Sequence, residues 1–160
     1  APGQGVTFVV EIPVVEPEEE RKVETGKGTA PPTEKRILVV EDDEQVASIL
    51  QRLLAEDDHD TLWARDGVGA LDALSQAREC DEPFELMISD VKMPRMSGIR
   101  LYERVSQENA ELAKHTLFIT GDTMSSGTRE FLRNVGLPYL TKPFKIEELR
   151  HAVARALREV

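Results

Sequence analysis

The sequence predicts an α/β protein in which a parallel sheet of five strands is covered by helices on both faces, a doubly wound fold. Two observations lead to this prediction. From residue 36 onward, short apolar runs typical of buried strands alternate with stretches whose apolar residues recur at helical spacing. Five such strand–helix units within about 125 residues are typical of a parallel sheet with crossover helices.

The first two units begin at residue 36. Residues 36–40 (RILVV) form a continuous apolar run, as expected of a strand that is buried on both faces. Residues 44–56 are predicted to be helical because apolar side chains recur every three or four positions, at Val46, Ile49, Leu50, Leu53 and Leu54. The second unit consists of a short strand at residues 60–64 and a helix at residues 67–77.

The third and fourth units follow the same pattern. Residues 86–89 are again a strand of the buried type, and residues 98–107 form a helix with one apolar face. Residues 116–120 (TLFIT) are the fourth strand, and residues 128–135 are the fourth helix. Gly136 is expected to end that helix, because glycine readily adopts the left-handed conformation found at helix C-termini.

The fifth unit is a short strand at residues 139–141 followed by a helix at residues 145–159, whose apolar side chains lie on one side. These five units predict one α/β domain over residues 36–160. The strand order expected for it is 2-1-3-4-5, the flavodoxin-like order of doubly wound sheets.

The first 35 residues have a different composition. Residues 14–35 contain prolines and a run of glutamates with few apolar side chains, so we interpret them as an acidic linker that cannot bury enough surface to fold. Residues 5–13 (GVTFVVEIP) are a β-rich run that a proline ends. We therefore expect three segments, at residues 1–13, 14–35 and 36–160.

Charge and composition exclude several classes of protein. The net charge of −10 argues against nucleic acid as a direct partner, because phosphate backbones bind basic surfaces. No apolar stretch is long enough to span a bilayer, so we expect no direct membrane contact. A single cysteine, Cys80, suits a reducing cytoplasm. Since residue 1 is Ala rather than Met, we expect a part of a longer protein.

Polar side chains follow four of the five predicted strands. Glu41, Asp42 and Asp43 follow the first, Asp90 the third, Thr120 ends the fourth, and Lys142 and Pro143 follow the fifth. Because ligands of open parallel sheets bind outside the carboxyl ends of the strands, these side chains are expected to lie close together.

Such a group of residues suits phosphoryl transfer. Converging carboxylates repel one another unless a cation lies between them, and hard oxygen ligands of this kind favour Mg²⁺ over zinc or copper. A carboxylate beside the metal can act as a nucleophile and form an aspartyl phosphate. A lysine and a threonine nearby could bind the oxygens of the transferred group.

The motifs resemble those of response-regulator receiver domains. They are the acidic pair Asp42-Asp43 after an apolar strand, residues 90–98 (DVKMPRMSG), Thr120-Gly121 and Lys142-Pro143-Phe144. The resemblance covers about residues 36–160, and the order and spacing of the motifs agree throughout.

The resemblance implies a role for each matching residue. Asp90 would be the phosphoacceptor nucleophile, and Lys142 and Thr120 would bind phosphoryl oxygens. Asp42, Asp43 and Asp90 would bind Mg²⁺ together with the backbone carbonyl of Lys92, and Mn²⁺ could replace Mg²⁺. The peptide bond between Lys142 and Pro143 would be cis, and Tyr139 would rotate with the movement of Thr120.

The N-terminal run carries a second resemblance. Residues 3–8 (GQGVTF) and 9–13 (VVEIP) are similar to the closing glycine box and last strand of a histidine-kinase ATP-binding domain. The other nucleotide-binding motifs and the phosphorylated-histidine motif are absent. The order of kinase remnant, linker and receiver resembles a hybrid sensor histidine kinase, which implies a cytoplasmic receiver in a parent whose missing sensor region could be membrane-attached. The expected partners are a phosphohistidine donor kinase domain, in the same parent chain or another, and a downstream histidine phosphotransfer protein.

Three alternative functions are weighed against the phosphorelay receiver. A stand-alone receiver could bind a target protein when it is phosphorylated, and a pseudo-receiver could bind partners without chemistry, although all five key side-chain types are present. A phosphatase of related fold would need an acid/base aspartate at position 92, where this chain has lysine. We interpret His59, His115 and His151 as residues without a catalytic or metal-binding role, and Asp57-Asp58 as a solvated turn.

Overall fold

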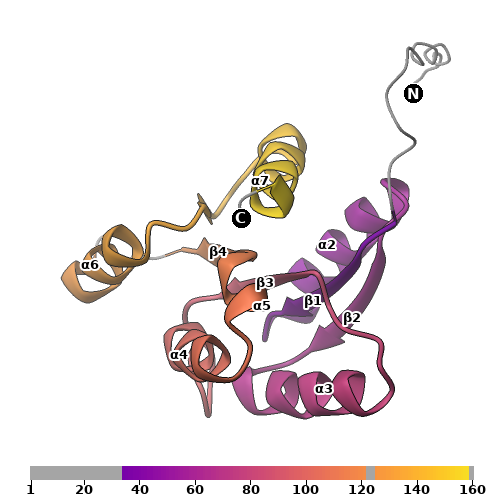
Figure 1. The fold of residues 1–160 in the computed structure, drawn as a ribbon. Helices are drawn as coiled ribbons and strands as arrows, with labels where there is room; N and C mark the ends of the chain where they lie inside the picture. The colour runs from indigo at the N-terminus through magenta and orange to yellow at the C-terminus, as the bar shows by residue number, and fades with distance from the viewer. Residues whose placement is uncertain (1–33, 122–124, 159–160) are drawn as a thin grey trace, which may run out of the picture. The chain divides into compact units, whose positions relative to one another are not determined.

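The structure is a computed structural model that describes residues 34–121 and 125–158, and Figure 1 shows its helices and strands. The predicted kinase remnant at residues 1–13 and most of the predicted linker, residues 14–33, lie outside the described residues. No helix in residues 34–121 or 125–158 combines the length and apolar character that a membrane crossing requires.

Five strands and six helices form the described part of the chain. The strands are β1 Arg36–Val40, β2 Asp60–Ala64, β3 Leu86–Asp90, β4 Thr116–Thr120 and β5 Tyr139–Thr141. The helices are α2 Glu44–Glu56, α3 Gly67–Glu79, α4 Gly98–Glu108, α5 Ala110–Lys114, α6 Ser126–Val135 and α7 Ile146–Arg158.

The strands form one sheet in the order β2-β1-β3-β4-β5, and every neighbouring pair is parallel. The predicted fold class and strand order are therefore confirmed. The register pairs Val40 with Ala64 and with Ser89, and Asp90 with Ile119. The carboxyl ends of the strands consequently lie along one edge of the sheet.

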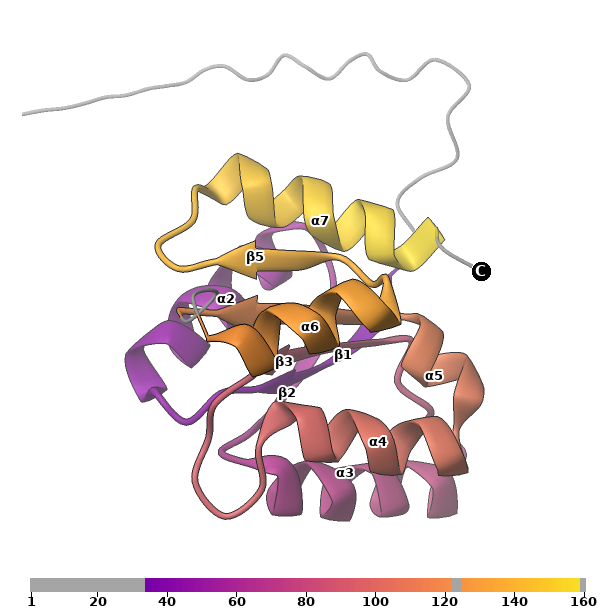
Figure 2. The ribbon, with the colours of Figure 1, turned by 90° about the vertical axis from the view of Figure 1, so that its left-hand side faces the viewer.

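Helices cover both faces, as Figures 1 and 2 show: α7 lies on the opposite side of the sheet from α3 and α4. Alternate strand residues point to opposite faces. In β1, Ile37 and Val39 pack in a core cluster with residues of α2 and α7. Leu38 and Val40 pack in a second cluster with residues of α3, α4 and α5. The near-continuous apolar runs of the central strands follow from this burial on both sides.

A third, smaller cluster joins α6 to the rest of the domain. Phe118 of β4 makes edge-to-face ring contacts with Tyr102 of α4 and Phe131 of α6, at centroid distances of 5.7 and 5.3 Å. Such aromatic contacts add to the energy of apolar burial. Burial raises the pKa of the Tyr102 hydroxyl.

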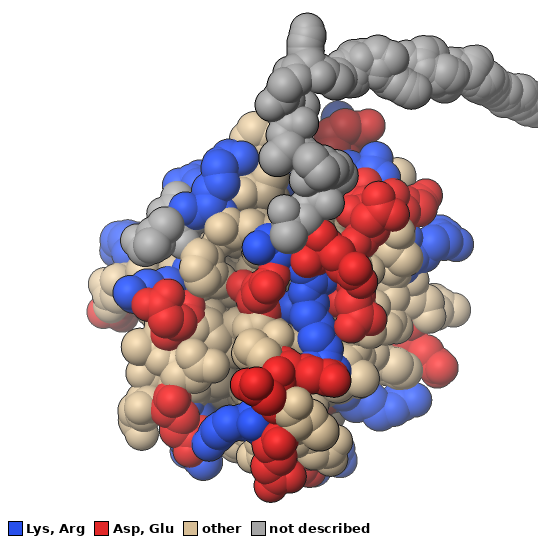
Figure 3. All heavy atoms as spheres, turned by 45° about the vertical axis from the view of Figure 1, so that its right-hand side comes forward, with Lys and Arg blue, Asp and Glu red and all other residues tan. Residues whose placement is uncertain are grey.

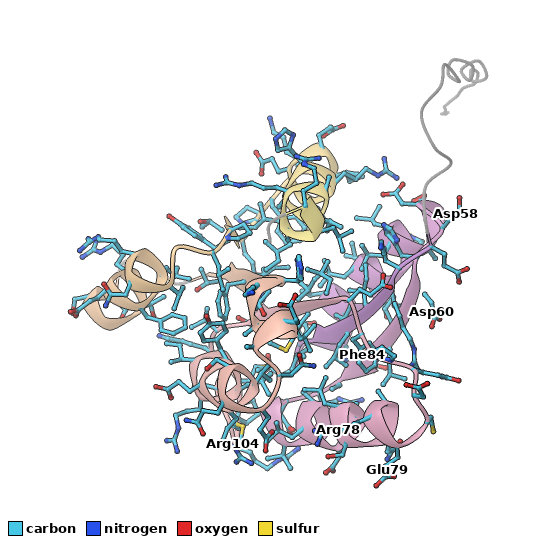
Figure 4. The ribbon with its side chains drawn as sticks, in the orientation of Figure 1. Asp58, Asp60, Arg78, Glu79, Phe84 and Arg104 are labelled. Atoms are coloured by element: carbon cyan, nitrogen blue, oxygen red, sulfur yellow. The ribbon has the colours of Figure 1, made fainter. Side chains whose placement is uncertain are left out.

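Ion pairs connect the amino ends of the strands, at the edge of the sheet where Figure 4 labels Asp58 and Asp60. Arg36 Nε lies 3.3 Å from Asp60 Oδ2, and its guanidinium also stacks over the ring of Phe84, 4.7 Å from the ring centroid. On the face drawn in Figure 3, acidic and basic side chains are interspersed. Part of the large acidic content of the chain is thus offset locally by neighbouring arginine and lysine.

The predicted element boundaries differ from the observed ones by few residues. β3 extends to Asp90, and α3 continues to Glu79. α6 begins at Ser126, two residues earlier than predicted, because Ser125 caps it and accepts a hydrogen bond from the Thr128 amide. Gly136 ends α6 with a φ of 68°, as predicted. The short helix α5 was not predicted.

Candidate functional site

The site lies at the carboxyl edge of the sheet, where β1, β3, β4 and β5 end. The main chain continues the sheet pattern one step beyond β1, because the Glu41 amide donates to the Ala64 carbonyl at 3.0 Å. On the other side, the Lys142 amide donates to the Thr120 carbonyl at 2.8 Å. These two bonds fix the residues that follow β1 and β5 beside Asp90, the last residue of β3.

Three carboxylates meet at this edge. One carboxylate oxygen from each of Glu41, Asp42 and Asp90 lies within 4.8 Å of the other two. Glu41 is 1% exposed and Asp90 7% exposed, whereas Asp42 is exposed to solvent. The group therefore has two buried carboxylates and one that faces outward, a shape that leaves an approach from solvent.

Lys142 bridges the two buried carboxylates. Its Nζ lies 3.0 Å from Glu41 Oε2 and 3.1 Å from Asp90 Oδ2, and it donates a hydrogen bond to the Asp90 oxygen. Its approach to Glu41 is an ion pair, since Glu41 Oε2 accepts no hydrogen bond from the described residues. One ammonium thus offsets the charge of two acids that would otherwise repel each other.

The charge states reflect this crowding. Burial, with a further contribution from the Asp90 charge, raises the pKa of Glu41 to about 7, against the opposing effects of the Asp43 amide and Lys142. Burial alone would lower the pKa of Lys142, but Glu41 and Asp90 more than offset this and raise it. A carboxyl group with a pKa near neutrality is one for which a bound cation would favour the ionised form.

Asp43, which was expected among the metal ligands, is not in this group. Its Oδ1 accepts hydrogen bonds from the amides of Gln45 and Val46, at 2.9 and 3.3 Å, and so it caps the N-terminus of α2. The residue that the sequence interpretation left out is Glu41. The acidic pair at the end of β1 is therefore Glu41-Asp42 rather than Asp42-Asp43.

The other expected site residues occupy the same edge. Thr120 is the last residue of β4, is 1% exposed and is paired in register with Thr141. The amide of Lys92 donates to Asp90 Oδ1 at 3.3 Å. The peptide bond between Lys142 and Pro143 is cis. Tyr139 in β5 is 48% exposed.

The turn after Asp90 requires a glycine at residue 98. The Gly98 amide donates to the Val91 carbonyl at 2.8 Å, which brings the start of α4 against the end of β3. A Cβ atom at this position would lie 2.0 Å from the Asp90 carbonyl oxygen, well inside van der Waals contact. The absence of a side chain at Gly98 therefore allows α4 to begin directly beside the phosphoacceptor candidate.

The donor set fits a small divalent cation. All three side chains offer carboxylate oxygens, and oxygen-only ligands with an open side suit Mg²⁺. In residues 34–121 and 125–158, this is the one group of three acidic, histidine or cysteine side chains with such spacing. His115 has a structural contact instead, since its Nδ1 lies 2.7 Å from the Ala156 carbonyl oxygen.

Comparison with known proteins agrees with this geometry. Residues 37–154 match the family described as the response regulator receiver domain. The transcriptional regulatory protein YrkP of Bacillus subtilis is 35% identical over 124 residues, which cover 77% of this chain and 49% of that protein. The chain spans half or less of the length of the first curated relatives that it matches.

Solved structures share the fold. The chemotaxis protein CheY4 of Vibrio cholerae has a TM-score of 0.66 and 26% identity, over 78% of this chain and 99% of that one. The receiver domain of the sensor histidine kinase PA1611 of Pseudomonas aeruginosa has a TM-score of 0.65 and 21% identity, over 78% and 98% of the two chains. That structure holds a magnesium ion in its active-site cleft.

Proposed function

Since this chain belongs to the response regulator receiver domain family, we propose that it accepts a phosphoryl group from a phosphohistidine onto Asp90, in a reaction that requires Mg²⁺. The observation that carries the proposal is the position of Asp90. Its carboxylate ends β3, lies within reach of two further carboxylates and contacts the ammonium of Lys142. A nucleophile, a cation site and a positive charge for phosphoryl oxygens therefore lie together.

Glu41, Asp42 and Asp90 would hold the Mg²⁺ ion, with the backbone carbonyl of Lys92 as a further ligand. When bound, the ion would offset the negative charge that accumulates as the phosphoryl oxygens approach the carboxylates. Mn²⁺, which prefers similar oxygen ligands, could replace it.

The residues of the chain would act in a simple sequence. One Asp90 carboxylate oxygen attacks the phosphorus, the bond between phosphorus and the donor imidazole nitrogen breaks, and the nitrogen keeps the electron pair. The Lys142 ammonium would then leave the carboxylates and form an ion pair with a phosphoryl oxygen. The Thr120 hydroxyl would donate a hydrogen bond to another, and the exposed Tyr139 would follow the threonine inward.

Phosphorylation by acetyl phosphate tests this function directly. We expect labelling of the wild-type protein in Mg²⁺, no labelling in EDTA, and none of the Asp90→Asn variant. Asp58→Asn is a matched control, because Asp58 lies at the amino end of β2 and has a φ of 65°, which asparagine adopts readily. Labelling that survives in Asp90→Asn, or a loss of labelling in Asp58→Asn, would contradict the assignment.

A finer proposal concerns the parent protein. We propose that the domain is the cytoplasmic receiver of a hybrid sensor histidine kinase, and the resemblance of residues 3–13 to a kinase glycine box supports this. The alternative is a stand-alone switch that binds a target protein. Phosphorylated protein mixed with a histidine phosphotransfer protein separates the two, because only a relay domain should lose its label rapidly to that partner's imidazole.

A further inference from the structure

The loop between β3 and α4, residues 91–97, is attached to the start of α3 by three contacts. The Arg95 guanidinium forms an ion pair with the Asp66 carboxylate. The Gly67 amide donates to the Met96 carbonyl at 3.3 Å. The Met96 side chain covers Gly67 so closely that a Cβ there would lie 2.6 Å from Met96 Cγ. The loop that follows Asp90 is thus fixed at its far end to a different helix.

The Asp66 side chain is only 2% exposed, so its carboxylate needs polar partners within the protein. One of its oxygens caps α3 by accepting a hydrogen bond from the Gly69 amide at 2.8 Å. The other faces Arg95. A buried carboxylate needs both kinds of contact to compensate for the loss of water, so the guanidinium is a required part of the arrangement.

Arg95 reaches Asp66 from a backbone conformation that is uncommon for its residue type. Its φ is 65°, in the left-handed region that glycine and asparagine adopt more readily. The contact of the Arg95 side chain with Asp66 explains why an arginine occupies this position. The guanidinium itself is mostly exposed, with a side-chain exposure of 67%, so its contact with Asp66 rather than burial holds it in place.

We infer that the Arg95–Asp66 ion pair positions residues 91–97 so that the Lys92 carbonyl and the Asp90 carboxylate face the same cation. This inference rests on the proposed function, because it concerns the metal site of that reaction. Lys92 lies between the two fixed points, the end of β3 and the Arg95 contact, and its amide already bonds to Asp90 Oδ1. Releasing Arg95 would remove one of the three contacts at that end of the loop, so that the Met96 contacts alone hold it and the Lys92 peptide can turn away more easily.

Four variants separate the effect of losing the ion pair from other effects of the substitutions. Arg95→Gly removes the guanidinium and also relieves the left-handed backbone. Asp66→Asn removes the charge but keeps an N-cap residue for the Gly69 amide, since asparagine caps helices as well as aspartate does. Arg95→Lys keeps a positive charge. Arg100→Ala is the control, because it removes an exposed arginine from the adjoining helix, where Arg100 contacts only Glu103 among the ion pairs of the described residues.

Two readouts are needed. Amide hydrogen exchange in EDTA reports on the loop itself, through the amides of Gly67, Lys92 and Gly98. Mg²⁺ affinity is measured by the fluorescence of Trp63, the one tryptophan of the chain, whose indole nitrogen donates to the Glu41 carbonyl at 2.8 Å. Thermal unfolding of every variant identifies general loss of stability.

We expect faster exchange of these amides in Arg95→Gly and Asp66→Asn, and an Mg²⁺ affinity that is roughly tenfold weaker, the lower end of what outer partners of metal ligands contribute. Arg95→Lys should retain most of the affinity, and Arg100→Ala should equal the wild type. At saturating Mg²⁺ the two weakened variants should accept phosphate at nearly the wild-type rate.

Unchanged exchange in both Arg95→Gly and Asp66→Asn would overturn the inference, and so would faster exchange with an unchanged Mg²⁺ affinity. A wild-type protein that binds no Mg²⁺ would instead contradict the proposed function, together with any role of the loop in metal binding. The exchange data in EDTA distinguish that outcome from a failure of the ion pair alone.

Discussion

At the scale of single residues, the ionisation of Glu41 determines much of the electrostatics of the site. Its carboxyl is buried beside Asp90, and only Lys142 offers a compensating charge among the described side chains in contact with it. Burial of the charged form is costly, so in the folded domain without a cation Glu41 is partly protonated near neutral pH. Two acids and one ammonium are then close to electrically balanced.

This ionisation predicts how stability depends on pH in the metal-free domain. The folded-state pKa of Glu41, about 7, lies above its ordinary value of 4.5. Between these values the folded state binds more protons than the unfolded state, so the free energy of unfolding should fall as pH rises from about 4.5 to 7. The contribution of Glu41 is complete below pH 4.5 and lost above pH 7, and is on the order of 3 kcal/mol.

Urea unfolding in EDTA at pH 5 and pH 8 measures this effect, with Glu41→Gln as the comparison. The variant cannot ionise at this position, so its stability should change less between the two pH values than that of the wild type. Equal pH dependence in the two proteins would show that Glu41 does not titrate in this range. Mg²⁺ should restore part of the wild-type stability at pH 8.

A second prediction separates Glu41 from Asp43. Glu41→Gln should weaken Mg²⁺ binding more than about tenfold, because it removes a ligand charge from the acidic group. Asp43→Asn should leave the affinity within about twofold, since asparagine also caps helices and Asp43 lies outside that group. Isothermal titration with Mg²⁺ provides the test. A loss of affinity in Asp43→Asn equal to that in Glu41→Gln would restore Asp43 as a ligand.

The sequence could not settle which acids form the pair. Glu41, Asp42 and Asp43 are consecutive, and any two neighbours follow the apolar strand equally well. The choice depends on where β1 ends, and one residue of shift moves every side chain to the other face. The signal that was available is the N-cap preference of aspartate immediately before a helix, which applies to Asp43.

At the scale of elements, the close approach of α4 to β3 gives a third prediction. Gly98→Ala should destabilise the domain by about 2 kcal/mol or more, because its Cβ would collide with backbone rather than with a flexible side chain. The shift should also displace Asp90 and weaken Mg²⁺ binding. Thermal unfolding and Mg²⁺ titration measure the two effects.

Gly127→Ala is the matched control for this substitution. The nearest atom to a Cβ at Gly127 is Ser125 Oγ at 3.9 Å, and the residue lies in the first turn of α6. Alanine in a helix is favourable relative to glycine, so the control should be unchanged or slightly more stable. If Gly98→Ala is as stable as this control, the contact between α4 and β3 is less constrained than its geometry indicates.

The elements that the sequence predicted well have strong periodic patterns, and those it missed do not. The five strands were located to within one residue, because their apolar runs are bounded by polar turns. α5 has only five residues, too few to show a helical period, and it begins immediately after α4, capped by Asn109. The Arg95–Asp66 contact joins residues 29 positions apart, which local patterns do not reveal.

At the scale of the whole molecule, three core clusters join the sheet to its helices within the described residues. The first of these clusters contains the side chains that pack α2 and α7 against the sheet. The site is likewise formed by residues 41–142. The apolar run of residues 5–13 lies outside the described residues, and the sequence alone indicates a strand that has lost its own domain.

Because residues 14–33 have few apolar side chains to bury, we expect removal of residues 1–33 to leave the melting temperature within about two degrees of the full chain, well under 1 kcal/mol for a domain of this size. Removal of residues 1–13 alone is the control that separates the apolar run from the acidic linker. The same two proteins should bind Mg²⁺ and accept phosphate as the full chain does. If both truncated proteins lost several degrees, residues 5–13 would have to pack on the receiver, because an apolar strand without a partner tends to pair with an exposed sheet edge.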